Sequence, residues 1–331
     1  MTNVCRGFGL VDLIVGLAGI SVLVALLLPV LHAAQASKER IRCAAQMRTL
    51  AVALNEYHDT FEVFPPAHTI ATNTSASWQR EPAPDQSYFW SWAYRISPFL
   101  GLDVFFDGID PNDWPFGLVF DKGHPNEGEP VIGFPYPAFG CPADPRSVLP
   151  NFGATAVTLS SYLGVNGRNQ FAEESAGGQD GILYVNSTVS INDITDGVSN
   201  TLILGERPPT SNFAWGYAWA GAGGSPGPVF FGTADVTLGV HEWASFPDNA
   251  SPVTFHYKPG ALSPTSSERY HFWSFHNGGG NWAFADGSVR FLTYAVDSPD
   301  NETTIPGNPP TVLAQFATRA GGIGLFTHED Q

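Results

Sequence analysis

The feature that most constrains this chain is an almost uninterrupted apolar run from Phe8 to Leu31, which contains a single acidic residue, Asp12. A helix of about 20 apolar residues is long enough to cross a bilayer. A carboxylate inside such a segment is unfavourable and normally has a partner there. We therefore expect a transmembrane helix over residues 8–31 whose one acid meets a positive charge.

The residues around the start of this run resemble the class III signal of type IV prepilins and type II secretion pseudopilins. The resemblance rests on Cys5-Arg6-Gly7-Phe8 and on Asp12, which is the fifth residue after Gly7. In that family prepilin peptidase cleaves after the glycine and methylates the new N-terminal phenylalanine. The resemblance implies a prepilin-type leader over residues 1–7, processing at Gly7, an N-methylated Phe8, and a role for Asp12 in assembly, although Glu is the usual acid there.

Two other interpretations of the N-terminal region stay open. An ordinary secretory signal has an apolar core of about 7–15 residues followed by a small-x-small cleavage site, which Ala34-Gln35-Ala36 could supply. A plain signal anchor would explain the length of the run, but not Gly7-Phe8 or Asp12.

The charges beside the run bear on its orientation. Arg6 precedes it, whereas Lys38, Arg40, Arg42 and Arg48 follow it, which opposes the positive-inside rule for a cytoplasmic N-terminus. Pilin-like proteins are nonetheless oriented that way. The resemblance therefore implies a single-pass inner-membrane protein with a cytoplasmic N-terminus and a head that is periplasmic or part of a cell-surface filament.

The helix is expected to continue beyond the apolar run. No Pro or Gly occurs between His32 and His58, and good helix formers dominate. A four-three-four-three spacing places apolar residues on one stripe: Cys43, Met47, Leu50, Leu54 and Tyr57. We predict a pilin-like N-terminal helix over residues 8–58 that buries this stripe against a head, with a kink at Pro29, where pilins often carry a helix-bending proline.

Charge and cysteine content indicate an exported protein. The chain has a formal net charge of −16 with only 15 Lys and Arg residues, so no nucleic-acid partner is expected. Cys5 would leave with the leader, and the remaining Cys43 and Cys141 are candidates for a disulfide. Two separate buried thiols are the alternative.

Residues 59–331 are expected to form a β-rich head with a loop-rich insertion at about residues 103–150. Asn281 to Ala285 and Ser288 to Tyr294 flank Asp286-Gly287, a dipeptide that favours a two-residue hairpin turn. The other candidate strands are bounded by Gly, Asn or Asp: Ser160 to Val165, Gly181 to Tyr184, Thr201 to Gly205 and Ala214 to Trp219. The predicted fold class is α+β, with a mostly antiparallel sheet packed on the long helix.

Three further motifs extend the resemblance to the head: 161–167 (Ser-Tyr-Leu-Gly-Val-Asn-Gly), 193–201 followed by Gly205-Glu206, and His276 separated by nine residues from Asp286-Gly287. They resemble a large family of bacterial pilin-like proteins with a C-terminal domain of unknown function. The resemblance marks these family-motif residues: Asp196, Gly197, Ser199, Asn200, His276, Asp286 and Gly287.

Catalytic motifs for common enzyme classes are missing from the sequence. It has no phosphate-binding loop with Lys, no Cys-x-x-Cys and no His-Glu-x-x-His, and nothing nominates a nucleophile to act with His276 and Asp286. His271 and His276 would point to opposite faces of a regular strand, which disfavours joint metal ligation. We expect no enzyme, and a His276 ring that hydrogen-bonds the backbone of its own loop.

One segment has oxygens that a cation such as calcium could use: Asp193, Asp196 and Asn200. An Asp-Gly turn followed by an Asn-capped strand explains the same residues. We expect that turn, and no cofactor otherwise.

These features together predict a pilin-like or pseudopilin-like structural subunit. It would assemble through its N-terminal helix, with copies of itself or other pilin-like subunits, into a type IV pilus-like or type II secretion-like filament. The alternative is a non-polymerising, membrane-anchored binding protein whose head recognises a ligand or glycan. The aromatic-rich segment from Trp78 to Leu100 suits either a glycan surface or a core.

Overall fold

The computed structural model describes residues 10–69, 90–102, 135–146, 151–152, 155–156, 158–169, 179–211, 216, 218–219, 236–244, 253–262, 266–297 and 311–321. Gly7, Phe8 and most of the insertion predicted at about 103–150 lie outside these residues. Asp12 lies in a described helix, but its side chain is not among those described.

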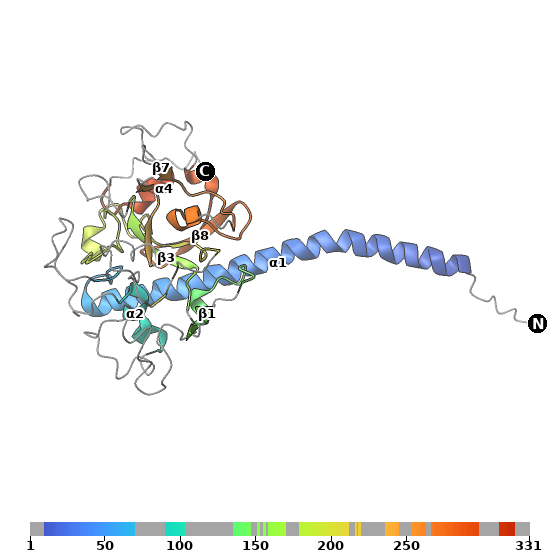
Figure 1. The fold of residues 1–331 in the computed structure, drawn as a ribbon, viewed down its shortest axis with the longest axis horizontal. Helices are drawn as coiled ribbons and strands as arrows, with labels where there is room; N and C mark the ends of the chain where they lie inside the picture. The colour runs from blue at the N-terminus through green and yellow to red at the C-terminus, as the bar shows by residue number, and fades with distance from the viewer. Residues whose placement is uncertain are drawn as a thin grey trace, which may run out of the picture.

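One long helix, α1 (Leu10–Phe61), extends from the N-terminal region into the head. Figure 1 shows its N-terminal half projecting well beyond the head and its C-terminal half lying against it. The helix continues through Pro29 and is gently curved rather than sharply kinked in Figure 1. It ends at Glu62, whose φ of 64° is left-handed, a common way to terminate a helix.

The predicted apolar stripe of α1 is confirmed as its buried face. All of these side chains are at most 3% exposed: Cys43, Met47, Leu50, Leu54 and Tyr57. They belong to a core that also contains residues of the sheet, such as Tyr162, Leu204 and Ala283. The second half of α1 is therefore an integral part of the head.

A five-stranded sheet with the order β5-β3-β4-β8-β9 forms the centre of the head. The pairs β3-β4, β4-β8 and β8-β9 are antiparallel, and β3-β5 is parallel. The bounds of the strands are β3 Tyr162–Gly167, β4 Leu202–Glu206, β5 Thr237–Gly239, β8 Gly279–Phe284 and β9 Val289–Thr293. This mixed but mostly antiparallel sheet, with the long helix, confirms the α+β class.

Short elements complete the described part of the head. Two small antiparallel ladders join β1 (Asn151–Phe152) to β2 (Thr155–Ala156) and β6 (Glu242–Ala244) to β7 (Val253–Phe255). The remaining helices are short: α2 Trp92–Arg95, α4 Val312–Ala317, and the 3-10 helices η1 Ser97–Leu100, η4 Pro137–Phe139, η6 Ile191–Asp193, η8 Ser266–Tyr270 and η9 Tyr294–Asp297.

The sheet has a core on each face, because alternate strand residues point to opposite sides. On one side it packs against α1. On the other, Leu163, Trp282 and Phe284 pack with Leu313 and Ala317 of α4. The head is therefore a three-layer arrangement, with α1 and α4 on opposite sides of the sheet (Figure 1).

Two strand predictions differ from the structure. Gly181 to Tyr184 is irregular, although Gly181 and Leu183 donate backbone hydrogen bonds to the end of β3. The segment therefore lies beside β3 without forming a regular ladder with it. Of Ala214 to Trp219, the described residues 216, 218 and 219 are not in a strand.

The predicted β8-β9 hairpin is present, but its turn is longer than expected. The backbone N–H of Gly287 donates to Phe284 O at 2.9 Å, and that of Phe284 donates to Ser288 O at 2.9 Å. Only Gly287 of this turn has a positive φ, 79°, whereas the expected two-residue type I′ turn needs two such residues. Gly287 therefore takes the bulge position after a three-residue loop.

Candidate functional site at the stalk–head junction

The N-terminal half of α1 is an exposed apolar rod. Its large side chains between Leu10 and Leu31 are mostly about half exposed or more, for example Leu10 at 75% and Leu26 at 65%. The helix is long and apolar enough to cross a membrane by length and composition. An exposed apolar surface of this extent requires a lipid or protein environment, so this half of α1 is the membrane-anchoring element.

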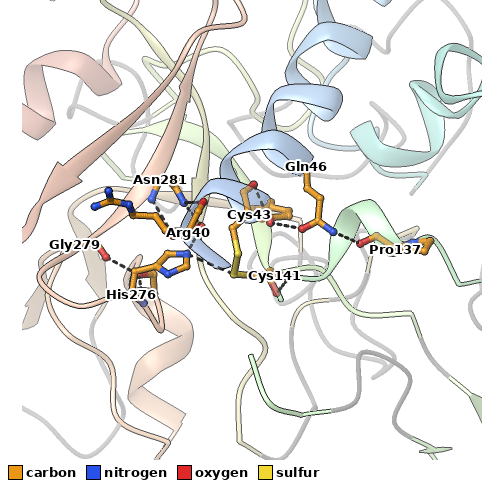
Figure 2. The surroundings of a disulfide bond; sticks show 12 residues. Arg40, Cys43, Gln46, Pro137, Cys141, His276, Gly279 and Asn281 are labelled. Carbon is orange, nitrogen blue, oxygen red and sulfur yellow. Dashed lines mark hydrogen bonds and ion pairs between the residues drawn. A yellow bond between two sulfur atoms is a disulfide. The ribbon is translucent and has the colours of Figure 1, made fainter. Parts of the chain in front are cut away.

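A group of polar and sulfur-bearing residues joins this rod to the head, and we call it the stalk–head junction. It consists of Arg40, Cys43 and Gln46 of α1 together with Cys141, Tyr162, Glu206, His276 and Asn281 of the head. Figure 2 shows part of this group around the disulfide.

A disulfide between Cys43 and Cys141 connects α1 to the segment after η4. The S–S distance is 2.11 Å, the Cα atoms are 5.0 Å apart, and the two residues are 98 positions apart in sequence. Both cysteines are at most 4% exposed. The backbone N–H of Cys141 also donates to Ser161 Oγ at 3.0 Å. The loop carrying Cys141 is thereby fixed to the residue that precedes β3.

Glu206, the last residue of β4, is a buried acid beside the disulfide. Its side chain is 2% exposed. It accepts hydrogen bonds from the backbone N–H of Asn281 at 2.9 Å and from its side-chain amide at 2.8 Å. The same amide is 3.4 Å from the carbonyl oxygen of Arg40 on α1. Asn281 therefore links the acid to the stalk.

The His276 ring lies beside the disulfide (Figure 2) and near this acid. Its Nε2 is 3.4 Å from Glu206 Oε1 and 3.7 Å from Cys141 Sγ. The sequence interpretation that its ring hydrogen-bonds the backbone of its own loop is wrong. Only its backbone N–H is used locally, donating to Ser274 Oγ at 3.0 Å. The reason is long-range packing that brings β4 and the Cys141 loop beside the ring.

Tyr162 adds a second polar link to α1. Its hydroxyl lies 3.2 Å from both Cys43 O and Gln46 Oε1, and the amide of Gln46 donates to Pro137 O at 2.9 Å. Burial, and secondarily the charge of Glu206, raises the pKa of Tyr162 well above its usual value. The hydroxyl stays protonated and can donate to α1.

Asp286 does not pair with His276. These residues lie beyond opposite ends of β8, which extends from Gly279 to Phe284. Asp286 is exposed and accepts a hydrogen bond from the Ser288 N–H at 2.8 Å. The His-to-Asp-Gly motif therefore marks the two ends of one strand: the junction at one and the hairpin turn at the other.

Of the other motif residues, Asp196 fixes the C-terminal segment to the head, and its neighbours shape the turn around it. Asp196 Oδ2 accepts hydrogen bonds from the Gly321 N–H at 2.8 Å and from Thr318 Oγ1 at 3.4 Å. The Asn200 amide donates to Asp196 O at 3.2 Å, and Arg290 donates to Ser199 O at 2.8 Å. Gly197 has a φ of 92°, a conformation that glycine adopts readily.

The three oxygen-bearing residues considered for calcium have different partners. Asp193 accepts hydrogen bonds from the N–H and hydroxyl of Ser190 at 2.8 and 2.7 Å. The backbone hydrogen bond, and to a smaller extent the hydroxyl hydrogen bond, lowers the pKa of Asp193. Asp196 and Asn200 make the contacts given above, and calcium binding stays an alternative to the expected turn that no observation here tests.

The junction was only partly visible in the sequence. The sequence predicts roles for Cys43, Cys141 and His276, but it gives no such signal for Gln46, Tyr162 or Asn281. Glu206 ends one of the family motifs, but the sequence indicates no partner for it. Trp90 and Trp92 of the aromatic-rich segment are at most 1% exposed, so they belong to the core.

Comparison with known proteins identifies a family. The model of a family described as "Protein of unknown function (DUF1559)" matches residues 35–299, from α1 to just beyond η9. No curated protein and no solved structure matches the chain. The family is typical of pilin-like proteins with an N-terminal hydrophobic helix, as observed here. Because the match spans most of the chain, this protein is a member of the DUF1559 family.

Proposed function

We propose that this protein is a pilin-like or pseudopilin-like subunit. Prepilin peptidase would process it after Gly7, and it would assemble through its N-terminal helix into a type IV pilus-like or type II secretion-like filament. The observation that carries the proposal is the division of α1. One half is an exposed apolar rod, and the other is a buried part of the head.

In this proposal the exposed half of α1 occupies two environments in turn. Before assembly it spans the inner membrane, with the N-terminus cytoplasmic and the head periplasmic. In the filament its apolar surface packs against neighbouring copies or other pilin-like subunits. Such contacts are heterologous, and when they do not close into a ring they generate a helical filament.

Asp12 would set the register of that packing. After cleavage, Phe8 carries a positive amino group, and a neighbour's Asp12 carboxylate would neutralise it. Unpaired charges in a low-dielectric environment are strongly disfavoured, and removing one member of a buried pair leaves the other uncompensated. The pair would therefore favour one axial position of neighbouring subunits.

Processing can be tested by the intact mass of the protein purified from its native membrane. We expect loss of residues 1–7 and the addition of one methyl group, and we expect Gly7→Leu to retain the leader. Gly9→Ala is a matched glycine substitution that should be processed normally. A mature chain that starts at Ser37 would show an ordinary secretory signal, and an unprocessed wild-type chain would show a plain anchor.

Assembly can be tested with Asp12→Ala. We expect normal membrane insertion and a normally folded head, but a large reduction in filaments sheared from cells and counted by electron microscopy. Asp12→Glu should preserve assembly, since it keeps the charge on a longer side chain. Ser21→Ala removes a hydroxyl that donates to Leu17 O of its own helix, so it is the control for a polar substitution in the span. Wild-type filament yield from Asp12→Ala would contradict the proposal.

A further inference from the structure

A second cluster of titratable side chains lies in the head, away from the junction. His241 is in the turn between β5 and β6, His256 follows β7 directly, and Asp297 is the last residue of η9. One nitrogen of each histidine and one oxygen of the aspartate lie within 4.8 Å of one another. Three segments distant in sequence thus bring three ligand-type atoms together.

The β6-β7 ladder explains why the histidines meet. Glu242 pairs with Phe255, so one further step along the two strands brings His241 opposite His256. Directly opposed side chains on an antiparallel pair have Cβ atoms about 4.5–5.5 Å apart. The two imidazole rings lie 4.6 Å apart between centroids, at an interplanar angle of 64°.

Asp297 is held in place by groups outside the pair of histidines. Its Oδ2 accepts a hydrogen bond from the Tyr257 N–H at 2.7 Å, and its Oδ1 accepts one from Thr311 Oγ1 at 2.5 Å. Thr311 in turn caps α4 by accepting from the Ala314 N–H. Metal-binding carboxylates are commonly oriented by such hydrogen bonds.

The carboxylate of this cluster is shielded from solvent, whereas the two histidines are partly exposed. The side chain of Asp297 is 0% exposed, whereas those of His241 and His256 are 17% and 18% exposed. The cluster therefore combines a buried carboxylate with an outer side that solvent reaches.

One histidine nitrogen of this cluster has no hydrogen bond to a described residue. His241 Nε2 is 2.5 Å from Asp297 Oδ1 and is satisfied there. His256 Nδ1 is buried and has no hydrogen-bond partner among the described residues. It is 3.6 Å from Asp297 Oδ2, too far for an ordinary hydrogen bond. A buried nitrogen without a partner is unfavourable, and a metal ion would satisfy it.

The spacing suits an ion after a small rearrangement. Zinc is bound about 2.0–2.1 Å from nitrogen and oxygen in tetrahedral geometry, which places neighbouring ligand atoms about 3.3 Å apart. The present separations of 2.5 and 3.6 Å fall on either side of that value. Binding would replace the proton that His241 now donates to Asp297, as metal binding to imidazole generally does.

We propose that His241, His256 and Asp297 bind one zinc-like divalent transition-metal ion, with a coordination position left on the solvent side. Two imidazoles and one carboxylate are a ligand set for Zn²⁺ and similar ions, whereas Ca²⁺ and Mg²⁺ prefer oxygen ligands. An open fourth position accepts water or a further ligand. The protein would then present a metal centre on its head, in addition to its role as a subunit.

The described residues contain one other group of possible metal ligands, and its chemistry does not suit a metal ion. Cys43, Cys141, Glu206 and His276 also have ligand atoms within 4.8 Å of one another. The two sulfur atoms are joined in a disulfide and are not thiolates, the form that binds metal. Among the residues that the structure describes, the oxidised protein is therefore expected to bind zinc only at His241, His256 and Asp297.

The test is Zn²⁺ binding by the full mature chain in detergent, measured by competition with a chromogenic chelator under non-reducing conditions. We expect one saturable Zn²⁺ site per chain that millimolar Ca²⁺ and Mg²⁺ do not displace. His256→Gln is the principal variant, because His256 Nδ1 has no hydrogen bond to lose. We expect the dissociation constant for Zn²⁺ to rise by about 100-fold or more, since even the loss of an outer hydrogen bond to a ligand lowers metal affinity by about 10–100-fold.

The controls separate this site from non-specific binding. His58→Gln removes another histidine beside a carboxylate, His58 Nδ1 being 3.8 Å from Asp59, and should leave binding unchanged. Thr311→Val should weaken binding by about 10-fold or more and Thr311→Ser should restore it. Thermal unfolding in a chelator identifies folded variants, and Co²⁺ absorption reports the coordination. Absence of a one-to-one site, or wild-type affinity in folded His256→Gln, would overturn the proposal.

Discussion

Replacing both Cys43 and Cys141 with serine will lower the free energy of unfolding of the protein by about 4–5 kcal/mol. The bond closes a loop between residues 98 positions apart, and a cross-link of about 100 residues restricts the unfolded chain by about 4.7 kcal/mol in the chain-entropy description. Chemical denaturation of the full chain in detergent measures the difference.

The reduced protein supplies a matched control for this substitution. Wild-type protein in a strong reductant should lose a similar amount of stability, whereas the doubly substituted protein should not respond to the reductant. A loss below about 1 kcal/mol would mean that the polar contacts of Tyr162, Gln46 and Asn281 hold the stalk helix to the head without the covalent bond.

Lowering the pH from 7 to 4.5 will reduce the free energy of unfolding by about 4–5 kcal/mol. Burial, with Arg95 adding to it, lowers the pKa of His68 to about 3, and burial lowers that of His271 to about 4. Both are neutral in the folded protein at pH 4.5, but protonate near pH 6.5 once unfolded. The unfolded state therefore binds more protons, so stability is full above about pH 6.5 and falls as the pH drops towards 4.

Each histidine should contribute up to about 1.4 kcal/mol per pH unit within that window. His68→Gln will be less stable at pH 7, but its dependence on pH should be about half that of the wild-type protein. Denaturant unfolding at pH 7, 5.5 and 4.5 gives both slopes. Equal slopes for the two proteins would show that His68 is not the group that takes up the proton.

The features predicted well from the sequence are those set by local periodicity. The stripe from Cys43 to Tyr57 is buried as its spacing indicates, and the β8-β9 hairpin follows from two strand-forming runs around Asp286-Gly287. Helix and strand periods determine which face of an element is apolar, whatever it packs against. The α+β arrangement follows from these two elements.

The features that were missed depend on contacts between distant residues. Whether His276 meets its own backbone or Glu206 is decided by how β4 lies beside β8, a pairing of residues about eighty positions apart that has no local signal. His241 and His256 become neighbours only through the β6-β7 ladder. For Gly181 to Tyr184 the local pattern suits a strand, but its two backbone hydrogen bonds to β3 do not make a regular ladder.

The position of the disulfide has a mechanical consequence. Cys43 is the first residue along the stalk helix, among those whose side chains are described, that is buried in the head. A pull on the membrane-proximal end of the helix meets the long polar contact between Arg40 O and the Asn281 amide, and then a covalent bond, which through Cys141 passes the force to the loop beside β3. The helix beyond Cys43 and the hydrogen bonds of the sheet are thus shielded from tension that would otherwise peel the helix from the core.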